Sequence, residues 1–153
     1  MKQQVRLLML ALGSLALTLT LAAQAPRATL EGMWSFTVDP DPEGLPTYSG
    51  LRSFSKSGTA IALDAVNTAP AGGLISTGVW ERSGGHEFSF VMYALVTTNG
   101  IQTGLRKIEG VVTLDASGNT LSGIGKTVSY DLAGNVLFSG TARLAGVRLP
   151  LID

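Results

Sequence analysis

Cysteine is absent from this chain of 153 residues, and histidine occurs only once. Without cysteine there is no disulfide bond, no thiolate nucleophile and no cysteine-ligated zinc or iron site. Charged residues make up only 14% of the chain, and 11 Lys and Arg balance 11 Asp and Glu. A balanced chain has no overall field to attract nucleic acid or an anionic membrane surface. We therefore expect no nucleic-acid partner.

The motifs of common cofactor and hydrolase sites are missing as well. The chain contains no Gly-x-Ser-x-Gly elbow, no phosphate-binding loop and no dinucleotide fingerprint. The single histidine, His86, follows Gly84-Gly85 and has no second histidine or cysteine with which to hold zinc. We interpret it as a solvated turn residue. The sequence thus predicts no cofactor, no metal and no recognisable catalytic residue.

One acidic stretch has part of the composition of a calcium loop. It contains Asp39, Asp41, Glu43 and Gly44, but prolines interrupt it and no distal Glu follows. Because proline also disfavours regular strand pairing, we expect a solvated acidic loop here, across a barrel mouth.

The first 25 residues have the order of a secretory signal peptide. Lys2 and Arg6 precede an uninterrupted run of apolar and small residues over 7–23, and alanines cluster at its end. Pro26 hinders cleavage directly after Ala25, so we expect the cut at a neighbouring position. The sequence predicts a signal peptide over 1–25, a single domain over 29–153 and an exported protein, periplasmic or secreted. A retained membrane anchor is the alternative, although the run barely reaches spanning length.

The rest of the chain alternates between strand patterns and turn signals. Nineteen glycines, many beside runs of Val, Ile, Thr and Phe, suit short strands joined by tight turns. Asn99-Gly100 is a strong hairpin signal, and similar Asp-to-Asn turns occur at 115–119 and 131–135. We expect eight strands, at 32–38, 51–54, 59–66, 74–82, 87–97 and 101–114 and after the two Asp-to-Asn turns. This pattern favours an all-β fold, an eight-stranded antiparallel up-and-down barrel.

Gly32 and Trp34 on the first strand, the meander, and Arg143 on the last strand together resemble the calycin superfamily of lipocalin- and avidin-like barrels. In that superfamily a first-strand Trp packs under a basic side chain near the closed end of the barrel. The resemblance therefore implies a barrel floor made by Gly32, Trp34 and Arg143, with Arg148 as the second candidate for the basic residue. The hairpin at 54–58 is also similar to that of short bacterial lipocalin-like domains. The chain has no room for the lipocalin C-terminal helix and no second or third lipocalin motif, so the ligand class stays open.

Four polar residues are candidates for ligand contacts inside the barrel. Arg106 and Tyr130 come first, followed by Tyr93 and Glu81. Strand register decides which of them face inward, because a slip of one residue reverses the two faces.

Three functions suit such a barrel. The leading interpretation is an exported lipocalin-like barrel that binds a small apolar ligand in its interior. The alternatives are an isomerase or cyclase barrel of the allene-oxide-cyclase kind, and a solid-cored envelope protein that only binds partners. The strand at 87–97 is apolar on both faces, with Val91, Tyr93 and Leu95 on the second one. That second face predicts either a homo-oligomer or coverage by a loop.

Overall fold

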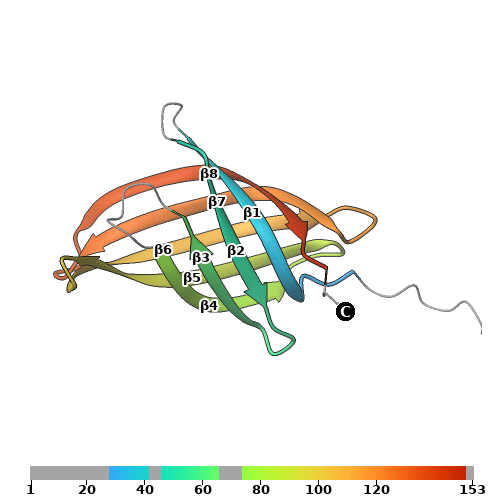
Figure 1. The fold of residues 1–153 in the computed structure, drawn as a ribbon, viewed down its shortest axis with the longest axis horizontal. Helices are drawn as coiled ribbons and strands as arrows, with labels where there is room; N and C mark the ends of the chain where they lie inside the picture. Colours follow the sequence, from blue (N-terminus) through green and yellow to red (C-terminus); the bar gives the residue numbers. More distant parts are fainter. Residues whose placement is uncertain (1–27, 42–45, 66–73, 151–153) are drawn as a thin grey trace, which may run out of the picture.

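The computed structural model describes residues 28–41, 46–65 and 74–150, which form a closed barrel of eight strands (Figure 1). Each strand pairs antiparallel with the next one in the chain, and pairing of the first strand with the last closes the barrel. The predicted all-β up-and-down barrel is confirmed, and the predicted signal peptide lies outside the described residues. No helix in this part of the chain is long and apolar enough to span a membrane. The strands are β1 (Gly32–Asp41), β2 (Tyr48–Phe54), β3 (Thr59–Asp64), β4 (Leu74–Arg82), β5 (Glu87–Thr98), β6 (Ile101–Leu114), β7 (Thr120–Asp131) and β8 (Val136–Arg148).

Local turn chemistry closes the hairpins. Asn99 and Gly100 have φ angles of 52° and 77°, the left-handed conformation that a tight hairpin needs and that an Asn-Gly pair tolerates. In the β6–β7 turn, the Asp115 carboxylate accepts hydrogen bonds from the Ser117 hydroxyl at 2.7 Å and from the backbone N–H groups of Asn119 and Thr120, each at 3.1 Å. These bonds, with that from Ser117 the largest, lower the pKa of Asp115 to about 2. Asp131 plays the same role in the β7–β8 turn.

The prediction of a loop from Asp39 onward is wrong for its first three residues. β1 continues to Asp41, and Pro40 lies opposite Ala142 of β8. Proline fits because pairing with β2 ends at Val38, so the far side of β1 is an edge there and needs no N–H donor. Glu43 and Gly44, the rest of the expected loop, lie outside the described residues.

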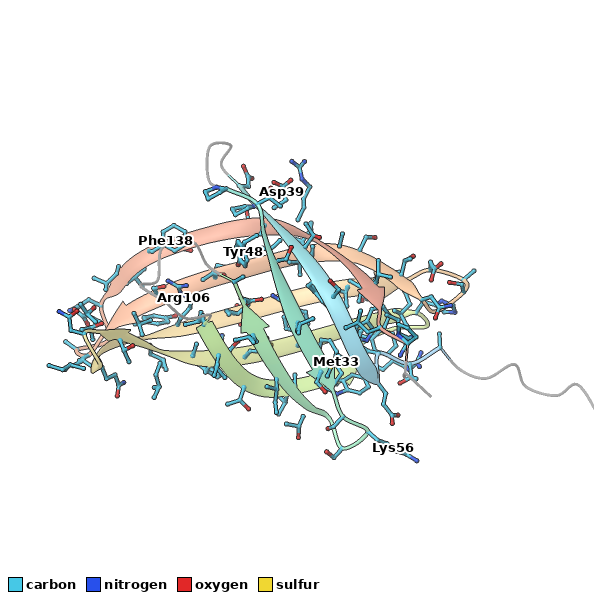
Figure 2. All side chains as sticks on the ribbon, viewed as in Figure 1. Met33, Asp39, Tyr48, Lys56, Arg106 and Phe138 are labelled. Carbon is cyan, nitrogen blue, oxygen red and sulfur yellow. The ribbon has the colours of Figure 1, made fainter. Side chains whose placement is uncertain are left out.

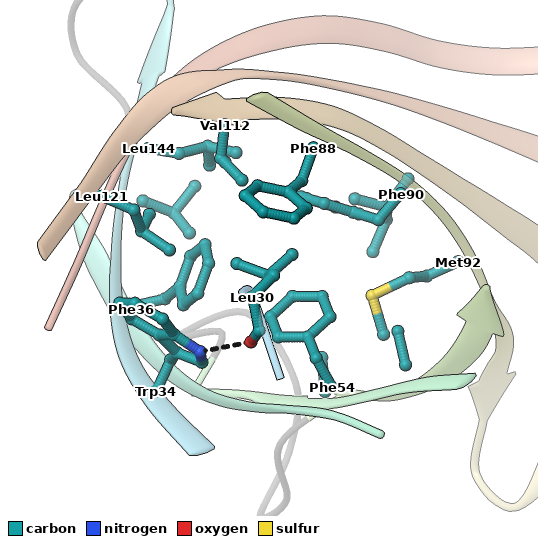
Figure 3. Close-up of a cluster of buried hydrophobic side chains, with 14 of the residues drawn as sticks. Leu30, Trp34, Phe36, Phe54, Phe88, Phe90, Met92, Val112, Leu121 and Leu144 are labelled. Carbon is teal, nitrogen blue, oxygen red and sulfur yellow. Dashed lines mark hydrogen bonds between the residues drawn. The ribbon is translucent and has the colours of Figure 1, made fainter. Parts of the chain in front are cut away.

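The half of the barrel where β1 begins is filled by side chains (Figure 3). The Phe54 ring lies at the centre of the aromatic contacts, with centroids 6.0 Å from Phe90, 6.1 Å from Trp80 and 6.3 Å from Phe36. Packing at these tilted or edge-on distances is favourable beyond the area that it buries. This half is therefore a solid core. Its fully buried large side chains include Leu30, Trp34, Phe36, Phe54, Phe88, Phe90, Met92 and Val112.

Candidate functional site: a barrel floor and an open-end pocket

The floor of the barrel is formed by the segment that leads into β1. Leu30 and Trp34 are both fully buried, and the indole Nε1 of Trp34 donates to the Leu30 carbonyl at 2.8 Å (Figure 3). Gly32 lies between them with a φ of 121°, and a Cβ there would come within 2.8 Å of an Arg148 nitrogen. Gly32 and Trp34 therefore lie together at this end of the barrel, beside Arg148.

The basic residue over Trp34 is Arg148, so the assignment of Arg143 to the floor is wrong. The Arg148 guanidinium carbon lies 4.3 Å from the Trp34 ring centre. Its nitrogens donate to the carbonyls of Thr29 at 2.6 Å, Gly118 at 3.0 Å and Glu31. Arg143 lies five residues before Arg148 on β8. Because side chains alternate between the two faces of a strand, its side chain points outward. Its side chain is 80% exposed and its Nε lies 3.2 Å from Asp39 Oδ2.

A second arginine secures the same segment. Arg82, at the end of β4, donates to the Ala28 carbonyl and lies over the Phe88 ring at 4.7 Å. The chain from Ala28 to Glu31 is thus held from two strands that lie apart in the barrel.

The other half of the barrel contains a cavity of about 350 Å³. Figure 2 shows Tyr48, Arg106 and Phe138 toward this end of the molecule, while Met33 and Lys56 mark the opposite end. Most of the cavity wall is apolar, and its polar side chains converge from several strands. The apolar wall includes Val38, Pro40, Leu74, Ile108, Phe138 and Ala142, and the polar wall includes Asp41, Tyr48, Asp64, Arg106, Thr127 and Thr141.

A buried ion pair, Arg52–Asp64, lies at the boundary between this cavity and the core. The Arg52 Nη2 lies 3.4 Å from Asp64 Oδ1, and both side chains are 2% exposed. The guanidinium lies 4.3 Å from the Phe36 ring centre and 5.4 Å from that of Phe90. Its Nε and Nη1 are buried without a hydrogen-bond partner among the described residues. Desolvation raises the pKa of Asp64, and Arg52 opposes that shift.

A glycine makes room for this carboxylate. Gly50 lies opposite Asp64 in the β2–β3 pair, and a Cβ at Gly50 would stand 2.1 Å from Asp64 Oδ1. Any larger residue would force Asp64 away from Arg52.

Arg106 is the one predicted ligand contact that lines the cavity. Its Nε donates to Ser129 Oγ at 3.0 Å, and the side chain is half-buried. Tyr48 also lines the cavity, and its pKa is raised by desolvation first and by Asp64 second, against smaller opposing effects of Arg52 and Arg106. The Tyr48 hydroxyl therefore stays protonated at neutral pH.

The other three predicted contacts face outward. Tyr130 lies opposite Leu105 in the β6–β7 pair, whereas its neighbour Ser129 lies opposite the inward Arg106. Tyr93 is 44% exposed between the buried Met92 and Ala94. Glu81 is exposed, and its neighbour Trp80 packs inward against the buried Phe88 ring. None of the three lines the cavity.

Tyr48, Arg52 and Asp64 were missed by the sequence reasoning. The predicted hairpin at 54–58 contained the necessary signal, because its register places Arg52 opposite Ala62 and hence diagonal to Asp64 on one face. Leu51 and Leu63 lie on the other face of the two strands. Because they are apolar as well, the sequence pattern does not show which face is buried. His86 lies exposed beside its turn, as expected.

The outer face of β2–β5 is almost free of charge. Its exposed apolar residues lie side by side across the strands, with Leu51 opposite Leu63 and Leu63 opposite Ile75. We call this surface the β2–β5 face. It consists of Leu51, Ile61, Leu63, Ile75, Val79, Tyr93 and Leu95, each 44–68% exposed.

Comparison with known proteins gives the fold and nothing finer. No family model matches the chain, and no curated protein matches it. Among solved structures the chain is similar to a redesigned β-barrel, with 16% identity and a TM-score of 0.52. The match covers 81% of this chain and 96% of the designed one. At that identity the likeness supports the barrel architecture alone.

Proposed function

We propose that this barrel, exported as its first 25 residues predict, binds a small and mostly apolar molecule in its open-end cavity. The observation that carries the proposal is the cavity of about 350 Å³ with apolar walls and a few converging polar groups. Binding sites for small molecules typically have this composition, and volumes of about 300–1,000 Å³. Because the other half of the barrel is filled by side chains, the ligand is compact and enters at one end.

A relationship to the calycins is part of the proposal. Its support is the arrangement at the floor, where Arg148 covers Trp34 at 4.3 Å and Gly32 leaves space for the arginine.

An isomerase or cyclase is the second candidate. Asp64 supports it, because a carboxyl group whose pKa is raised by burial, in the wall of a cavity, is typical of proton-transfer sites. Binding in the same cavity would be its first step, so binding is tested first.

Calorimetric titration with two compact probes, 2-naphthamide and 2-naphthoate, tests the proposed function. We expect one-to-one binding of at least one probe, and loss of that binding in Ala142→Phe, which fills the cavity wall. Ala145→Phe is the matched control, since Ala145 is exposed on the outside of the same strand. If the full chain bound neither probe, or if Ala142→Phe left binding unchanged, the proposed function would be wrong.

A further inference from the structure

Arg106 is a cationic side chain in the wall of a mostly apolar cavity. Only its Nε has a hydrogen-bond partner among the described residues, the Ser129 hydroxyl. None of the three ion pairs in this part of the chain includes Arg106. The two terminal nitrogens of the guanidinium therefore remain available to a molecule in the cavity.

We propose that the cavity is selective for a compact organic carboxylate, with Arg106 binding the carboxylate and the apolar wall holding the rest of the molecule. This inference rests on the proposed function and names the ligand class. A planar guanidinium binds a carboxylate through two parallel hydrogen bonds, and such charge-assisted bonds are stronger than neutral ones.

Among the described residues, Arg106 has no acidic partner inside the barrel. Asp64, the buried acid in the cavity wall, is paired with Arg52 at 3.4 Å and fixed there by the space that Gly50 leaves. Two arginines therefore face one buried carboxylate. Asp41 is the other acid in the wall, and it is exposed near the end of β1. With the exposed Asp41 left aside, Arg52, Arg106 and Asp64 give this part of the barrel two positive charges and one negative, which favours an anion beside Arg106.

Tyr48 adds a neutral donor to the same wall. A tyrosine hydroxyl is protonated at neutral pH, and burial raises the pKa of Tyr48 further, so it is able to donate to an oxygen that Arg106 holds. Val38, Ile108 and Phe138 line the same cavity and offer apolar contact beside these polar groups. A cavity of about 350 Å³ with mostly apolar walls and a few polar groups suits a ring system that carries a single acid group.

Comparison of 2-naphthoate with its neutral isostere 2-naphthamide tests the inference. By calorimetric titration of the full chain at neutral pH, we expect the carboxylate to bind roughly ten- to a hundredfold more tightly than the amide, the range for hydrogen bonds to a charged group. Arg106→Met removes the guanidinium but keeps the apolar stem, and we expect it to bind the two probes equally. Arg143→Met, which removes an exposed arginine from the outer face, is expected to keep the wild-type preference.

The outcomes separate the inference from the proposed function. If the wild type bound both probes equally, or if Arg106→Met kept the preference, the inference would be wrong while the cavity remained a binding site. If neither probe bound the wild type, both would be wrong. Amide binding by Arg106→Met reports that the variant is folded. If that variant lost amide binding, Arg106→Gln, which still reaches Ser129, gives the same comparison with the same expected loss of preference.

Discussion

Replacing Arg148 by Met tests the structure of the barrel floor. The change keeps the apolar stem and removes the guanidinium. Three backbone carbonyls, those of Thr29, Glu31 and Gly118, lose their donors, and the Trp34 ring loses the cation above it. Because Trp34 also holds Leu30 through its indole N–H, we expect the whole segment ahead of β1 to loosen.

The magnitude follows from these contacts. Arg148 is half-buried, so each hydrogen bond contributes about 0.5–1.5 kcal/mol, and the cation–π contact adds about 0.5–1 kcal/mol. These contributions sum to about 2–5.5 kcal/mol, and because water reaches the half-exposed site we expect Arg148→Met to lower the free energy of unfolding by the lower part of that range, about 2–4 kcal/mol. In urea, where a protein of this size changes stability by about 1–3 kcal/mol per molar, the midpoint falls by about 1–2 M with an unchanged slope.

Arg143→Met is the matched control for this change. It lies five residues earlier on β8, and its exposed ion pair with Asp39 contributes less than about 1 kcal/mol. Tryptophan fluorescence during urea titration measures both variants. An Arg143→Met protein as destabilised as Arg148→Met, or an Arg148→Met protein with the wild-type midpoint, would refute the assignment of Arg148 to the floor.

Two other predictions concern the turns and the outer surface. Asp115→Asn is expected to lower the melting temperature at pH 7 and to lower it much less at pH 2. The folded pKa of about 2 lies below the ordinary aspartate value of 3.8, so most of the stability that the Asp115 carboxylate adds is lost as the pH falls from 3.8 to 2. A difference in melting temperature that stayed constant down to pH 2 would contradict this. We also expect two copies of the chain to associate through the β2–β5 face, which presents on the order of 600 Å² of uncharged apolar surface, close to the area per partner in stable complexes. In sedimentation velocity, Leu63→Asp should convert that dimer to a monomer. Ile124→Asp, at an exposed position of β7 outside the β2–β5 face, should leave the dimer intact. A monomeric wild type would rule out the association.

The sequence contained enough local information to predict the fold. Turn residues such as Asn99-Gly100 and the Asp115 turn determine their hairpins through their own backbone conformations and hydrogen bonds. Hairpins at such spacing lead to a meander, and eight strands are enough to close it. The bounds of β4 and β6 were predicted without error for the same reason.

The candidate site was harder to predict because it depends on register and on distant pairing. Arg143 and Arg148 are both basic residues on β8, and only the register with β1 shows which one reaches Trp34. The sequence predicts a strand break at Pro40, because it does not show that the pairing of β1 with β2 stops at Val38. Arg52 was overlooked because Leu51 next to it is apolar and exposed, the reverse of the pattern that alternation rules assume.

Both ends of the described chain leave the barrel at the floor. Ala28 is held there by Arg82, and the N–H of Leu149 donates to the Met33 carbonyl at 2.8 Å. The cavity lies at the other end of β1, toward Asp41. A surface, label or fused domain attached ahead of Ala28 or after Pro150 would therefore be joined at the end away from the cavity. A barrel immobilised through either terminus would present its cavity to solution, and a ligand could enter and leave without passing the point of attachment.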